Sequence, residues 1–212
     1  MKYNSFESKL RYNKDKIHET GMCAFDGFTA MQHYNAFYYF WDFIEEYSPS
    51  RIIEIGTAAG GLTRFLQFAS NELNTQTKII SYDKTINPWN KLITPETGID
   101  LRVRDCFHGD ENNLNEIKQD IQSEGLTLVL CDGGNKFKEF NMLSAFLKSG
   151  DVIMSHDYAH DRETFDKNIK GKVWNWCECT YANISKSIED NNLTPFLYDR
   201  FSKAVWGSFR KP

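Results

Sequence analysis

The sequence predicts an α/β protein with a Rossmann-like, doubly wound and mostly parallel seven-stranded sheet that ends in a C-terminal antiparallel hairpin. Short apolar segments alternate with helix-like segments along residues 51–158, a pattern typical of parallel strands covered by helices on both faces. A string of small residues follows the first apolar run. The chain closes with two alternating segments, TPFLYDR and KAVWGSF, which indicate an antiparallel hairpin at the sheet edge.

The expected elements follow from the apolar periodicity. Residues 33–47 place aromatic side chains at helical spacing before a stop at Ser48–Ser50, which predicts a helix whose aromatic residues pack in the core. The five parallel strands are expected at residues 52–55, 78–82, 101–103, 126–131 and 151–155. Helices are expected at residues 62–73, 114–123, 137–148 and about 174–190, and Phe201 and Ser202 are expected to connect the hairpin.

Length and charge limit the class of protein. A chain of 212 residues fits one domain, which we divide into an N-terminal helical cap (1–50), a core (51–158) and a lid, helix and hairpin (159–212). The 29 acidic residues outnumber the 25 basic ones, so no basic field attracts nucleic acid. A small-molecule substrate is therefore expected and a nucleic acid is not, while the oligomeric state stays open, a homo-oligomer included.

The five cysteines are an odd number without disulfide-scaffold spacing, and Cys177-x-Cys179 lacks a second pair to complete a metal site. No apolar run resembles a signal peptide or reaches the length of a membrane span. We therefore expect a soluble, cytoplasmic protein without a membrane partner.

The stretch IIEIGTAAGGLTRFL forms a strand, a small-residue turn and a helix start. Glycines in such a turn let a ligand approach the backbone, and the helix offers free N–H groups. Gly56, Gly60 and Gly61 match neither G-x-G-x-x-G nor a P-loop, which favours a ligand without a pyrophosphate.

Two carboxylates end the following strands. Asp83 lies about twenty residues beyond Gly61, where an acid can accept hydrogen bonds from both hydroxyls of a ribose. Asp105 ends the third strand, where it can accept from an exocyclic amine such as that of adenine. The order of glycine turn, ribose acid and adenine acid is more specific than any one of them.

With these motifs the chain resembles the class I S-adenosylmethionine (SAM)-dependent methyltransferases. EIGTAAGG, LVLCDGGNKF and LKSGDVIMSHDY look like the branch of cephalosporin hydroxylase-like and macrocin-type O-methyltransferases. The resemblance covers most of the chain and implies SAM as the cofactor. It implies that the cofactor is bound by Glu54, Gly56, Thr57, Gly60, Gly61, Asp83, Asp105 and Asp132.

Asp132 ends the fourth strand, and His156 and Asp157 end the fifth. Adjacent parallel strands bring such side chains to one rim, where like charges repel unless a cation, an arginine or a proton lies between them. We expect a divalent cation, Mg²⁺ or Mn²⁺, bound by Asp132, His156 and Asp157. The alternative is that Asp132 only touches the cofactor while His156 and Asp157 form a hydrogen-bonded strand end.

The resemblance implies that such a metal binds and acidifies the acceptor hydroxyl, which also fits the chemistry of a weak nucleophile. The chain departs from the branch twice: His156 stands where an acid is frequent, which shifts metal preference away from Mg²⁺, and Asn135 replaces the histidine of D-G-x-H. Lys136, His156 and His160 remain as candidate general bases.

Residues 159–176 mix charges with Phe165, Trp174 and Trp176, as a mobile lid or an ordinary solvated loop would. Residues 25–34 are expected to form the opposite wall of the site. The leading hypothesis is an O-methyltransferase acting on a small polar, sugar-like or natural-product molecule. The alternatives are a hydroxylase or lyase on the same scaffold, a catalytically silent cofactor-binding module, and nucleic-acid methylation, which lacks a supporting motif.

Overall fold

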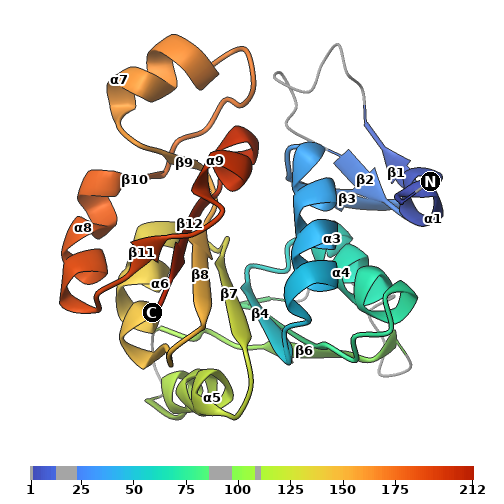
Figure 1. Cartoon of the computed structure of the whole chain (residues 1–212), viewed down its shortest axis with the longest axis horizontal. Helices are drawn as coiled ribbons and strands as arrows, with labels where there is room; N and C mark the ends of the chain where they lie inside the picture. The colour runs from blue at the N-terminus through green and yellow to red at the C-terminus, as the bar shows by residue number, and fades with distance from the viewer. Residues whose placement is uncertain (1, 13–22, 86–96, 108–110) are drawn as a thin grey trace.

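A seven-stranded sheet forms the centre of the protein. The structure, a computed structural model, describes residues 2–12, 23–85, 97–107 and 111–212. The strand order is β11-β12-β8-β7-β4-β5-β6, as Figure 1 shows in part. The parallel strands are β4 (Arg51–Ile55), β5 (Lys78–Asp83), β6 (Ile99–Val103), β7 (Thr127–Cys131) and β8 (Val152–Ser155). The predicted fold class and all five parallel strands are confirmed.

Helices cover both faces of this sheet (Figure 1). On one face lie α3 (Asn35–Tyr47) and α4 (Gly61–Glu72). On the other lie α5 (Glu111–Gln122), α6 (Lys136–Leu143), which a 3-10 turn at Ser144–Phe146 continues, and α8 (Tyr181–Asp190). Because the sheet is covered on both sides, every residue of β7 and β8 is buried and both strands are almost continuously apolar.

The aromatic stripe of α3 packs into the core, as its spacing predicts. Phe37 meets Phe65 of α4 edge to face, and Phe40 meets Trp206 in the same way. The helix ends at Tyr47, and Ser48 follows with a left-handed backbone. These contacts fix α3 beside the sheet, so the segment that precedes α3 is fixed beside the strand tips.

The N-terminal segment contains a small sheet that the expected helical cap did not include. After α1 (Asn4–Glu7), strands β1 (Leu10–Arg11), β2 (Cys23–Phe25) and β3 (Phe28–Ala30) pair antiparallel. Asp26 and Gly27 both have positive φ and form the tight β2–β3 turn, which an Asp-Gly pair between apolar residues favours. Residues 1 and 13–22 of the expected cap lie outside the described residues.

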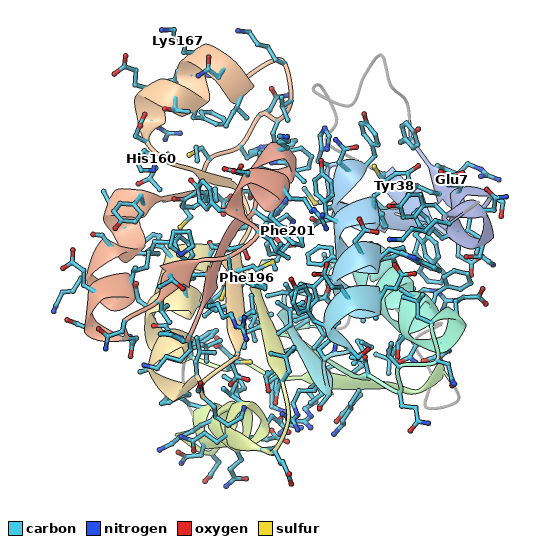
Figure 2. The ribbon with its side chains drawn as sticks, in the orientation of Figure 1. Glu7, Tyr38, His160, Lys167, Phe196 and Phe201 are labelled. Carbon is cyan, nitrogen blue, oxygen red and sulfur yellow. The ribbon has the colours of Figure 1, made fainter. Side chains whose placement is uncertain are left out.

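Helix α1 is tied to α3 by a side-chain contact. The Tyr38 hydroxyl donates to Glu7 at 3.1 Å, and Figure 2 labels both residues. The small sheet itself packs on α4, which places residues 29–32 next to the tip of β4.

The C-terminal region differs from the prediction in two places. Residues 174–180 are not helical: Trp174 forms a bridge with Lys170, and β10 (Cys179–Thr180) pairs in parallel with β9 (Tyr158–Ala159). Helix α8 therefore begins only at Tyr181, after a capping box of Thr180 and Asn183 that satisfies backbone N–H groups.

The antiparallel hairpin is present, with β12 (Gly207–Arg210) between β8 and β11 (Thr194–Pro195). Its connection is longer than the two residues expected, because α9 (Tyr198–Phe201) and a 3-10 turn (Ser202–Ala204) lie between the strands. The YDR residues are thus helical, and Phe201 packs on Phe40 of α3. None of the helices in the described ranges is both long and apolar enough to span a bilayer.

Candidate active site at the strand tips

The glycine corner between β4 and α4 is closely packed. Gly56 has φ +97°, and a Cβ there would collide with the Asp132 carbonyl at the tip of β7. A Cβ at Gly61 would collide with the carbonyl oxygens of Phe28 and Thr29 on β3. Gly60, with φ +80°, is the N-cap residue directly before α4. The small residues therefore let three chain segments meet around the helix N-terminus.

Glu54 lies buried beneath this corner. Its Oε2 accepts hydrogen bonds from Thr63 and Ser81, each at 2.5 Å, and the Ser81 hydroxyl also lies 2.6 Å from that of Thr57. Burial raises the pKa of Glu54 to about 7, although the two hydroxyls favour the charged form. A cation arriving at the corner would favour ionisation of this carboxylate.

Two cavities open at the strand tips, and both are lined by Gly56, Ala58 and Asp132. The larger cavity, about 460 Å³, lies over β5 and the segment after β6, whereas the polar cavity, about 170 Å³, lies toward β8. The larger cavity has more room for a bulky group such as a nucleoside, and the three shared residues place the polar cavity directly beside it.

In the larger cavity, Asp83 stands where the ribose acid is expected. Its Oδ2 accepts from the Ala58 N–H at 2.9 Å, which joins the tip of β5 to the glycine corner. Asp105 does not line this cavity; its Oδ1 accepts from the Phe107 N–H, and Lys84 lies 3.2 Å from its Oδ2. Asp105 thus holds the loop that presents Phe107 to the cavity.

Segments far apart in sequence wall the polar cavity. Residues 29–32 form one side, which agrees with the wall expected at 25–34, and Trp174, Trp176 and Glu178 form the other. From the segment 159–176, only Trp174 and Trp176 line this cavity. Its helical part, α7 (Arg162–Thr164) and the π-helix Phe165–Ile169, stands away from the sheet (Figures 1 and 2).

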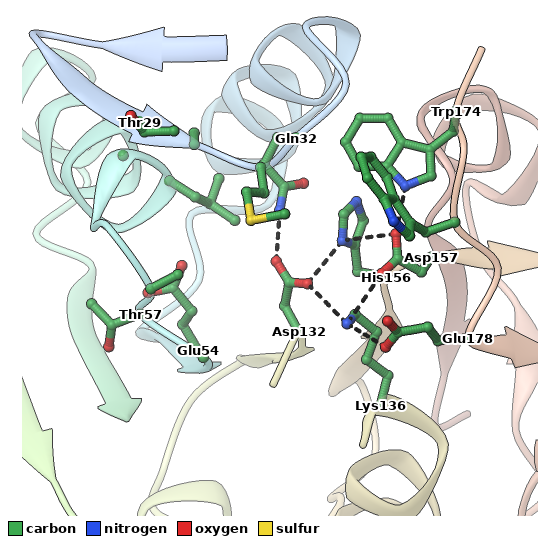
Figure 3. A pocket seen from close by; sticks show the side chains of 17 residues that line it. Thr29, Gln32, Glu54, Thr57, Asp132, Lys136, His156, Asp157, Trp174 and Glu178 are labelled. Atoms are coloured by element: carbon green, nitrogen blue, oxygen red, sulfur yellow. Dashed lines mark hydrogen bonds and ion pairs between the residues drawn. The ribbon is translucent and has the colours of Figure 1, made fainter. Parts of the chain in front are cut away.

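Figure 3 shows a charged cluster in the polar cavity, formed by four residues that the sequence singles out. His156 Nδ1 lies 2.8 Å from Asp132 Oδ1 and 3.7 Å from Asp157 Oδ1. Lys136 Nζ lies 3.1 Å from Asp157 Oδ2, 3.9 Å from Asp132 Oδ1 and 2.8 Å from Glu178 Oε2. The sequence-predicted convergence of Asp132, His156 and Asp157 at one rim is therefore seen.

The cluster stabilises its charged forms. Burial lowers the pKa of Lys136, but Asp132, Asp157 and Glu178 raise it more, so it stays well above the ordinary value. Burial likewise raises the pKa of Asp157, but His156 and Lys136 bring it below the ordinary value. A lysine held as ammonium cannot take a proton, which removes Lys136 from the candidate bases.

The imidazole of His156 is held in a fixed orientation. The imidazole contacts the rings of Trp174 and Trp206, and its buried Nε2 has no hydrogen-bond partner among the described residues. Burial lowers the pKa of His156, but Asp132 and Asp157 raise it to a net value above the ordinary one. His160, the third candidate, is exposed, stacks on Tyr181 and does not line the polar cavity.

The expected divalent cation does not fit these residues. Mg²⁺ takes several oxygen ligands at about 2.1 Å, but the ammonium of Lys136 lies between the carboxylates of Asp132 and Asp157. Gln32 donates to Asp132 at 2.6 Å, and Trp174 donates to Asp157 at 2.5 Å. No cluster of His, Cys, Asp or Glu suited to a metal ion occurs within the described ranges.

Sequence reasoning missed three residues of the site. Gln32 donates to Asp132 and accepts from Trp206 Nε1 at 2.9 Å, which fixes its amide. Glu139 accepts from the N–H groups of Gly133 and Asn135, each at 3.0 Å, and closes the loop after β7. Glu178 meets Lys136. Only Glu139 carried a local signal, an acid in the first turn of a predicted helix.

No protein-family model matches the sequence, and no curated protein does. Solved structures are similar in fold. One is a CmcI structure with Mg and SAM, at 14% identity and a TM-score of 0.65, over 95% of this chain and 85% of that chain. Another is the CmcI apo-structure, at 15% identity and a TM-score of 0.64, over 89% of this chain and 75% of that chain.

The chain therefore has the fold of the class I SAM-dependent methyltransferases, as its motifs predict. A third CmcI structure, with SAH (S-adenosylhomocysteine), agrees at 14% identity and a TM-score of 0.60, over 89% of this chain and 82% of that chain. CmcI is a cephalosporin hydroxylase-like O-methyltransferase, which is the branch that the sequence motifs resemble. At this identity the likeness concerns the fold.

Proposed function

We propose that the protein is a SAM-dependent O-methyltransferase that acts on a hydroxyl group of a small polar molecule. The observation that carries this proposal is the junction of the two cavities at Gly56 and Asp132. A cofactor in the larger cavity would present its reactive end at the junction, next to an acceptor in the polar cavity.

The residues of the larger cavity suit an adenosyl group. Asp83, which lines this cavity, would bind the ribose hydroxyls, and Phe107 and Cys106 would offer an apolar surface for the adenine. The glycine corner, with Thr57, Gly60 and Gly61, would take the methionine part, and buried Glu54 favours the positive charge of that part.

When bound, SAM is the co-substrate that supplies a methyl group on a sulfonium sulfur. That methyl group would pass to the acceptor oxygen, and the electron pair of the carbon–sulfur bond would remain on sulfur. His156 Nε2 would take the hydroxyl proton, while Asp132 accepts from Nδ1–H and would fix the tautomer. This pairing of a base with an orienting carboxylate is a common way to activate a hydroxyl group.

The walls of the polar cavity favour a polar acceptor with a flat apolar face. Gln32, Lys136 and Glu178 offer hydrogen bonds, while Trp176 and Met31 are exposed at 37% and 51%. A sugar-like or glycosylated natural product combines both features. The divalent cation expected from the sequence has no part in this proposal, because Lys136 lies among the carboxylates that would bind it.

Calorimetry with SAH and transfer of labelled methyl from SAM to a panel of hydroxylated compounds test the proposal. We expect micromolar binding of SAH and transfer to sugar-like acceptors. Absence of SAH binding would exclude a methyltransferase. Tight SAH binding without transfer to any acceptor would support the silent cofactor-binding module instead.

A further inference from the structure

Among the described residues that line the polar cavity, Lys136 is the sole Lys or Arg. It is the first residue of α6, and its side chain is 8% exposed. A cation at a helix N-terminus is disfavoured by the helix dipole, and burial adds a desolvation cost. The carboxylates of Asp132, Asp157 and Glu178 must therefore hold it there.

The ammonium occupies the position that the sequence assigns to a metal ion. It lies within 4 Å of carboxylates from two neighbouring strand tips, Asp132 and Asp157. A divalent cation in the same place would stand close to the Lys136 charge. Lysine and metal ion are thus mutually exclusive at this rim.

We infer that Lys136 is a built-in cation that takes the place of the divalent metal expected from the sequence and binds the oxygen of the acceptor. This inference rests on the proposed function and deepens it. Ammonium and metal serve one purpose here, since both draw the acceptor oxygen to the junction and stabilise negative charge that develops on it.

The contacts of Lys136 show how it meets the acceptor. Its ammonium donates to the Gly133 carbonyl and to Glu178, and it lies 3.1 Å from Asp157 Oδ2. The side chains of Lys136 and Asp157 are almost fully buried, whereas that of Glu178 is 47% exposed. Glu178 is therefore the partner that the acceptor oxygen replaces, while the other two contacts keep the ammonium in position.

A Mn²⁺ titration followed by electron paramagnetic resonance and by thermal melting tests this inference. The wild-type protein should bind no Mn²⁺ below millimolar concentration, and a chelator should leave SAH affinity unchanged. Lys136→Ala empties the space between the carboxylates, so it should bind Mn²⁺ at least tenfold more tightly than wild type and melt at a higher temperature when Mn²⁺ is added.

Two further variants separate charge from space. Lys136→Met removes the charge but fills the volume, so it should gain much less Mn²⁺ affinity than Lys136→Ala. Lys186→Ala removes a lysine that pairs with Asp190 on the exposed face of α8 and should behave as wild type.

Micromolar binding of Mn²⁺ to the wild-type protein would overturn the inference. So would a folded Lys136→Ala variant that binds Mn²⁺ no more tightly than wild type. The wild-type titration tests the inference even if a variant fails to fold. SAH calorimetry is a separate readout. If the Mn²⁺ titration refutes the built-in cation while SAH still binds, the proposed function stands. If SAH does not bind, the proposed function fails whatever the Mn²⁺ titration shows.

Discussion

His156 Nδ1 lies 2.8 Å from Asp132 Oδ1, so a hydrogen bond joins the tips of two neighbouring parallel strands. The bond leaves the buried Nε2 as the imidazole atom without a partner among the described residues. The carboxylate also accepts from Gln32, which Trp206 holds in place. The imidazole is thus oriented by a chain of contacts that runs from Trp206, directly before β12, through Gln32 to Asp132.

Replacing this imidazole should remove the base without removing the cofactor site. We expect His156→Gln to lower methyl transfer by about 10²- to 10⁴-fold, the usual contribution of a general base, and to leave SAH affinity within about threefold by calorimetry. His160→Gln is the matched control, because His160 is exposed and does not line the polar cavity. Equal losses in both variants would contradict the assignment.

Asp83 should contribute to cofactor binding rather than to chemistry. Asp83→Ala removes one acceptor for the ribose hydroxyls and should weaken SAH binding by about 1 to 2 kcal/mol, with the rate at saturating SAM little changed. Asp105→Ala should cost less, because Asp105 does not line the larger cavity. A greater loss for Asp105→Ala, measured by the same calorimetry, would restore the adenine role expected from the sequence.

The buried carboxyl of Glu54 should make stability depend on pH. Its pKa is about 7 in the folded protein against 4.5 for the free group, so the stabilisation is complete below about pH 4.5 and is lost as pH rises through about 7. Wild type should therefore lose about 3 kcal/mol relative to Glu54→Gln over this window. Urea unfolding at several pH values measures the difference.

The exposed Glu189→Gln serves as the control for that series, since Glu189 lies on the outer face of α8. Its unfolding free energy should follow that of wild type at every pH. A wild-type minus Glu54→Gln difference that stays constant from pH 4.5 to 8 would mean that folding does not raise the pKa of Glu54.

The glycine corner should not tolerate a side chain. Gly56→Ala combines a positive φ with a collision against the Asp132 carbonyl, so we expect a loss of at least about 2 kcal/mol of unfolding free energy and weaker SAH binding. Gly134→Ala meets no atom within 4 Å and has no positive φ. It should melt close to wild type, and equal destabilisation of the two variants would refute this account of the corner.

Local sequence patterns predicted the sheet and the rim of the site, because apolar strands and their terminal acids are set by residues close in sequence. Asp83, Asp132 and His156 lie where their strands end. The sequence did not show that Lys136 supplies the cation between the carboxylates of the rim, since its partners include Glu178 from a distant segment. Gln32 reaches Asp132 across 100 positions, and no local pattern indicates such a contact.

The C-terminal errors have a similar physical cause. The apolar spacing around Trp174 suggested a helix, but the indole donates to Asp157 and the chain pairs with β9. Tertiary hydrogen bonds there outweigh helical propensity. The Tyr198–Phe201 helix was not predicted, because the apolar–polar alternation of TPFLYDR indicates a strand. Phe201 packs against α3, and this distant contact is not visible in the local pattern.

A crystal structure of the protein with SAH tests the central claim most directly. The adenosyl group should lie in the larger cavity with its ribose on Asp83, and the sulfur should lie at the junction of Gly56 and Asp132, open toward His156 and Lys136. SAH bound with its sulfur away from Asp132, or no SAH at saturating concentration, would contradict the claim that the two cavities form one methyl-transfer site.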